Sequence, residues 1–146
     1  MACPGCGRTA QPDRSPRADR QWIDNTAGVI DQLRRDLALE SSAGGTLQAA
    51  REQLRQGLYP SLVAYTDFGG CRHMIVAAGT APPGFEHASR ALGAACRLLQ
   101  HAAALFTRAA SRHDAAALVS AGRVASSAAA LLVRAKAALQ AAATRR

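Results

Sequence analysis

The sequence LVSAGRVASSAAALLV, residues 118–133, decides the fold of this chain. It belongs to a longer stretch, residues 114–143, in which apolar residues recur at spacings of three and four, as in a helix that packs against other helices. These residues are Leu118, Ala121, Ala125, Ala128, Leu132, Ala135, Leu139 and Ala142. A helix of this length, about 45 Å at ~1.5 Å per residue, can bury such a face only against helices of similar length. We therefore predict an all-α fold.

The first predicted helix begins at Asp19, a residue type favoured at N-caps, and runs to Glu40. Its apolar face consists of Ile23, Thr26, Ile30, Leu33 and Leu37. Trp22 adjoins this face, so we expect it in the core rather than as a ligand platform. A loop should follow at residues 41–45. Residues 1–18 are rich in Pro, Gly and Arg and have no periodicity, which predicts a disordered leader before a single domain at residues 19–146.

Residues 45–79 contain signals that disagree. Pro60 and the Gly69-Gly70 pair favour breaks, whereas apolar residues keep the same three-four spacing across the whole segment. A loop between separate helices has no reason to preserve this spacing. We therefore expect one long helix kinked near Pro60 and weakened near Gly69. Two helices divided at Tyr59 and Pro60 are the alternative.

Residues 80–84, Thr-Ala-Pro-Pro-Gly, form the clearest breaker in the chain. The helix predicted after it has a regular apolar face, formed by Phe85, Ala88, Leu92, Ala95, Leu99, Ala102, Phe106 and Ala109. Residues 111–114 make a tight connection in which Asp114 can cap the last helix, so the last two helices should be antiparallel neighbours. The sequence therefore predicts an antiparallel up-and-down four-helix bundle, or five helices if the second is divided.

The net charge of +8 is concentrated in the second half of the chain. Residues 1–67 hold eight Arg against eight acids, whereas residues 68–146 hold nine Arg and Lys136 against Glu86 and Asp114. Most of these arginines recur on predicted outer helix faces, and we take them as candidate partner-binding residues: Arg90, Arg97, Arg108, Arg112, Arg123 and Arg134. A basic half suggests an acidic partner such as an actin filament, an anionic lipid surface or nucleic acid, and solvated helix faces explain the same charges more simply.

The sequence favours no catalytic site. The four His residues lie far apart in the sequence, and no phosphate-binding Gly loop, H-E-x-x-H motif or paired carboxylates occur. Cys3 and Cys6 form one C-x-x-C pair, but a structural zinc needs four ligands and no second pair follows. We therefore expect no metal and no cofactor, although zinc binding or redox sensing through Cys3 and Cys6 stays a less favoured hypothesis.

The sequence also suggests where in the cell the protein is located. Arginines interrupt every long Ala/Leu stretch, which argues against a membrane span. The N-terminus lacks the apolar core of a secretory signal. We therefore expect a cytoplasmic protein whose thiols are reduced.

Residues 118–136 resemble a known group of helical bundles. The segments Leu-Val-Ser-Ala, Arg-Val-Ala-Ser-Ser-Ala and Leu-Leu-Val-x-Ala-Lys are similar to Ala/Ser/Val-rich helices of talin-rod and I/LWEQ-type modules, and more loosely of vinculin and focal-adhesion-targeting bundles. The resemblance implies a non-enzymatic scaffold or adaptor of the cytoskeleton that binds F-actin through a basic helical face or offers a helix to a partner groove. The chain departs from the I/LWEQ pattern because it is a single short bundle without that family's conserved blocks. Binding to nucleic acid or anionic lipid is the alternative function.

Overall fold

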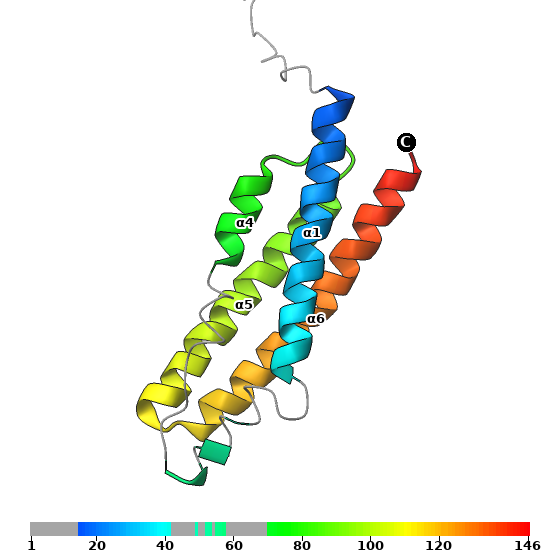
Figure 1. Ribbon diagram of the computed structural model, residues 1–146. Helices are drawn as coiled ribbons and strands as arrows, with labels where there is room; N and C mark the ends of the chain where they lie inside the picture. Colours follow the sequence, from blue (N-terminus) through cyan, green and yellow to red (C-terminus); the bar gives the residue numbers. More distant parts are fainter. Residues whose placement is uncertain (1–14, 42–48, 50–51, 54, 58–69) are drawn as a thin grey trace, which may run out of the picture.

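The computed structural model describes residues 15–41, 49, 52–53, 55–57 and 70–146, and every regular element among them is an α-helix (Figure 1). The four helices with defined bounds are α1 at Pro16–Ser41, α4 at Cys71–Ala78, α5 at Glu86–Arg112 and α6 at Ala115–Thr144. The prediction of an all-α fold is confirmed. α5 and α6 form a long hairpin, and α1 and α4 pack along it (Figure 1).

Helix α1 begins at Pro16, three residues before the predicted N-cap Asp19. The Ser15 hydroxyl oxygen accepts a hydrogen bond from the Ala18 N–H at 3.2 Å, as an N-cap side chain does. Proline suits the first position of a helix because its φ is already helical and no N–H is needed there. Residues 16–18 therefore belong to α1, with Ser15 as its N-cap, and not to the predicted leader, whereas residues 1–14, with Cys3 and Cys6, lie outside the described residues.

The prediction of one long helix over residues 45–79, kinked near Pro60, is wrong. Residues 49, 52, 53 and 55 are helical, but the chain turns at residues 56 and 57, where the φ of Gly57, +74°, is left-handed and incompatible with an α-helix. α4 begins only at Cys71, with Gly70 as its N-cap. The three-four spacing predicted a single helix because spacing records only where apolar side chains fall. It does not record the left-handed backbone conformation that glycine adopts readily. The alternative division at Tyr59 and Pro60 lies outside the described residues.

The predicted breaker and the predicted cap are both confirmed. α4 ends at Ala78, where the C-cap residue Gly79 has a φ of +83°, and α5 begins only at Glu86. His113, with a φ of +50°, ends α5, and the Asp114 side chain accepts from the Ala117 N–H at 3.0 Å. The chain thus reverses at His113 and Asp114, which makes α5 and α6 antiparallel neighbours (Figure 1).

The core lies along the α5–α6 hairpin and under α1. All eight apolar positions predicted on each helix of the hairpin are buried. On α1, Thr26, Ile30, Leu33 and Leu37 are buried as predicted, while Ile23 is only half-buried and Trp22 takes its place in the core. Alanine supplies much of the buried surface of α5 and α6, which lets the two backbones approach closely.

Trp22 joins α1 to the ends of two other helices. Its indole Nε1–H donates to the Gly79 carbonyl oxygen at 3.1 Å, at the end of α4. Its ring meets Phe85 edge-on, with centroids 5.8 Å apart, at the start of α5. The prediction that Trp22 belongs to the core is therefore confirmed.

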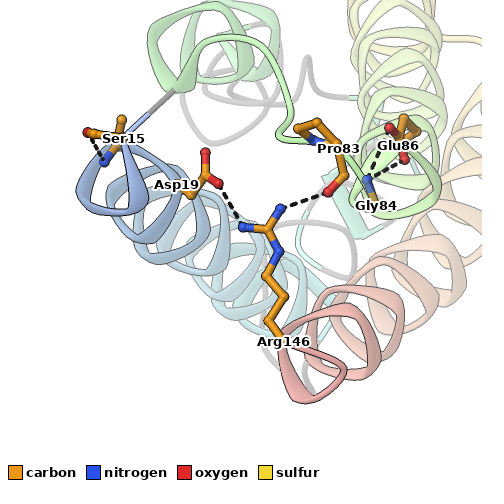
Figure 2. A network of polar contacts seen from close by, with 7 residues as sticks. Ser15, Asp19, Pro83, Gly84, Glu86 and Arg146 are labelled. Carbon is orange, nitrogen blue, oxygen red and sulfur yellow. Dashed lines mark hydrogen bonds and ion pairs between the residues drawn. The ribbon is translucent and has the colours of Figure 1, made fainter. Parts of the chain in front are cut away.

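A group around Arg146 closes the same end of the structure (Figure 2). The Arg146 guanidinium donates to a carboxylate oxygen of Asp19 at 2.7 Å and to the Pro83 carbonyl at 2.8 Å, and it lies 4.9 Å from the centre of the Phe85 ring. These contacts tie the end of α6 to the first turn of α1 and to the start of α5. Asp19, predicted to cap α1, instead makes this ion pair.

Candidate interaction surface

The six candidate arginines are all exposed to solvent. Arg90, Arg97, Arg108 and Arg112 lie on α5, and Arg123 and Arg134 lie on α6. Because the opposite sides of both helices are committed to the core, the packing of the hairpin turns these cations outward. The structure thus confirms that they lie away from the core.

Arg108 is partly engaged within the chain. Its Nε is 3.2 Å from Asp114 Oδ2, while the other oxygen of that carboxylate caps α6. The pair joins the last turns of α5 to the first turn of α6 across the reversal. Since the Arg108 side chain is more than half exposed, the pair adds less than about 1 kcal/mol to stability.

Arg90 lies near a second carboxylate, at the start of α5. The Glu86 side chain accepts from the Gly84 N–H through both oxygens, at 3.1 and 3.0 Å (Figure 2). Hydrogen bonds from the backbone N–H groups of Glu86 itself and of Gly84 lower the pKa of this carboxyl, and the charge of Arg90 lowers it further. Glu86 therefore stays ionised at the positive end of the helix.

Lys136, the remaining cation of α6, has a structural role. Its Nζ donates to Asp31 Oδ1 of α1 at 2.5 Å. This hydrogen bond is the largest cause of a lowered pKa at Asp31, and the charges of Lys136, Arg34 and Arg35 act in the same direction. Among the described residues no carboxylate forms an ion pair with Arg123 or Arg134, so these two are the α6 cations open to a partner.

Two cysteines of the described helices are oxidised, contrary to our expectation of reduced thiols. Cys71 and Cys96, which we expected as reduced thiols, form a disulfide between α4 and α5, with Cα atoms 5.6 Å apart. The separation of 25 residues gave no signal for this pairing, which depends on how α4 lies on α5. Across residues 15–41 and 70–146 no three His, Cys, Asp or Glu side chains gather as a metal site would need.

The residues that the structure describes line two open grooves. One, of about 470 Å³, lies between the start of α1 and the end of α6 and includes Asp19, Arg20, Ile23 and Arg146. Another, of about 440 Å³, lies between α1 and α4, beside Asn25, Val29 and Met74. Neither encloses a ligand as a typical small-molecule pocket does. The exposed helix faces are thus the more extensive surface available to a partner.

The length and composition of α6 also satisfy the minimum for a membrane-crossing helix. An 18-residue window within it has a mean hydropathy of 1.6, and a third of that window is buried in the structure. Core helices of soluble proteins have the same property, so it does not by itself assign α6 to a membrane. It does mark α6 as unusually apolar for a helix with one face in solvent.

No protein-family model matches the chain, and no curated protein or solved structure matches it significantly.

Proposed function

We propose that this chain is a non-enzymatic protein-interaction module, an antiparallel up-and-down helical bundle that binds an acidic partner through its basic α5–α6 hairpin. One observation carries the proposal: six arginines of the hairpin are exposed, and the two helices contain a single acid, Glu86. Such a surface attracts an acidic partner and speeds its association.

The resemblance of residues 118–136 to talin-rod and I/LWEQ-type helices makes F-actin the first partner to test. In this proposal the chain acts as a scaffold or adaptor of cytoskeletal type. The acidic filament surface would meet Arg90 and Arg97 of α5, with Arg112, Arg123 and Arg134 extending the contact. Arg108 contributes less because Asp114 already neutralises part of its charge.

Co-sedimentation with F-actin at low salt tests the proposal. The wild-type protein should pellet with the filaments, and Arg90→Glu with Arg97→Glu should release it to the supernatant because the net charge of one face falls by four units. The matched control is Arg34→Glu with Arg35→Glu, two exposed arginines of α1, which makes the same change in net charge elsewhere. If the wild-type protein stays in the supernatant, or the two double variants behave alike, the proposed actin-binding surface is wrong.

Nucleic acid is the alternative partner for the same arginines. Duplex DNA would be bound through its phosphates, so its affinity would fall steeply and log-linearly with salt concentration. The described surface exposes no aromatic ring for stacking unpaired bases, since Trp22, Phe85 and Phe106 are all buried. A duplex titration at two salt concentrations separates this function from binding to a protein.

A further inference from the structure

Helix α6 has a second apolar face, opposite the core. At about 100° per residue, Val119, Ser126, Ala130, Val133 and Ala137 lie within about 30° of one line along the helix. All five are exposed, and the two valines expose 44% and 52% of their surface. We call these five residues the outer face of α6. A helix that is apolar on both sides is usually buried on both sides, so this face has the composition of a surface that a partner covers.

The serine hydroxyl groups on and beside this face already donate hydrogen bonds within the helix. The Ser126 hydroxyl donates to the Gly122 carbonyl at 3.0 Å, and the Ser127 hydroxyl donates to the Arg123 carbonyl at 3.2 Å. A partner can therefore exclude water from the face without leaving a hydroxyl donor unpaired. The side chains are small, which allows the backbone of another helix to approach closely. A lipid surface would gain less, because insertion relies on large apolar side chains that this face lacks.

The charges beside the outer face indicate the charge of the partner that would fit it. Arg123 and Arg134 lie on one edge of it, separated by about 16 Å along the axis and about 20° around it. Lys136 is already paired with Asp31, and α6 contains no acid. Two copies of this chain meeting through α6 would therefore bring arginines together with no carboxylate between them.

We propose that the outer face of α6 binds an acidic amphipathic helix of another protein. The apolar side of that helix covers Val119 and Val133, and two carboxylates about 16 Å apart on one edge pair with Arg123 and Arg134. This proposal deepens the proposed function, and it rests on that function only in taking the partner to be a protein. It requires neither F-actin nor the arginines of α5.

A synthetic helical peptide of 25 residues provides the probe. It carries Leu and Ala along one face and two Glu eleven residues apart on one edge, and a matched peptide carries Lys at those two positions. Fluorescence anisotropy should show that the wild-type protein binds the Glu peptide at least tenfold more tightly than the Lys peptide. Val119→Glu with Val133→Glu should weaken binding at least tenfold, whereas Val76→Glu should not, because Val76 is a 71% exposed valine of α4.

The charge-reversal variant Arg123→Glu with Arg134→Glu should prefer the Lys peptide, a result that loss of folding cannot produce. Arg90→Glu with Arg97→Glu should retain affinity for the Glu peptide, which separates this test from the actin test. The proposal is overturned if the two peptides bind equally or if Val119→Glu with Val133→Glu binds as the wild type does. It is also overturned if the face instead mediates a dimer in sedimentation experiments, or binds phosphatidylserine vesicles but not the peptide.

Discussion

Helices α5 and α6 share one core and are similar in length, yet their outer faces differ in kind. α5 turns Arg90, Arg97, His101 and Arg108 to solvent, as a helix at the surface of a soluble protein does. α6 turns valine, alanine and internally bonded serine to solvent, with arginines along one edge. The inner faces thus account for the fold, and the contrast between the outer faces is the basis of the proposal that a partner covers α6.

The largest expected loss of stability concerns the apolar faces that α5 and α6 bury. Leu99→Ala on α5 should lower the free energy of unfolding by about 2 to 5 kcal/mol, because Leu99 is fully buried and the deletion leaves a cavity. Leu105→Ala should cost clearly less, because Leu105 is only partly buried. Urea denaturation of both variants measures the difference. Equal losses would mean that the division of α5 into inner and outer faces is wrong.

The disulfide comes next, since it attaches α4 to α5 and not to α6. Replacing Cys71 and Cys96 together with alanine should lower the free energy of unfolding by about 2 to 4 kcal/mol, because the cross-link no longer restricts the unfolded chain. Thermal denaturation of the oxidised wild-type protein and of the double variant gives this difference. Adding dithiothreitol should destabilise the wild-type protein and leave the variant unchanged. An equal response of both proteins to the reductant would contradict the assigned disulfide.

The smallest expected loss of stability concerns Lys136, the α6 cation that pairs with Asp31. The other two cations of α6, Arg123 and Arg134, are the ones open to a partner. Asp31→Asn removes the pair with Lys136 and should cost less than about 1 kcal/mol at neutral pH, because both side chains are about one-third exposed. The pKa of Asp31 is lowered in the folded protein, so its stabilising effect is complete above the unfolded pKa of ~3.9 and is lost as pH falls through the lowered pKa.

The pH dependence supplies the check on this pair. Urea denaturation of the wild-type protein and Asp31→Asn should show a difference that shrinks as the solution is acidified below the ordinary Asp range. A difference that stayed constant on acidification would show that Asp31 stabilises the fold by something other than its charge.

Spacing in the sequence was enough to predict the buried faces of α5 and α6 and most of that of α1. It failed at Gly57, where the local backbone conformation interrupts a continuous apolar pattern. It also failed at the start of α1, where Ser15 and Pro16 outweighed Asp19.

Contacts between residues far apart in the sequence could not be predicted from spacing, and the reason is a different one. Arg146 and Asp19 are 127 positions apart, and Asp31 and Lys136 are 105 apart, so their pairing follows only from how the helices are arranged. The exposure of the six arginines was predictable because it follows from helical periodicity. The outer face of α6 could also have been found in this way, because residues 115–144 contain too few polar residues for one fully solvated side.

The most direct test of this account compares two neighbouring residues of α6. Leu132 is fully buried and Val133 is half exposed, so a charge placed at these consecutive positions enters opposite faces of the helix. Urea denaturation should show that Val133→Asp stays within about 1 kcal/mol of the wild type, as exposed substitutions usually do. Leu132→Asp should lose more than about 3 kcal/mol or fail to fold, because it buries an unpaired charge. If Val133→Asp destabilises the protein as much as Leu132→Asp, the outer face of α6 is already buried in the isolated chain, and the account given for it is wrong.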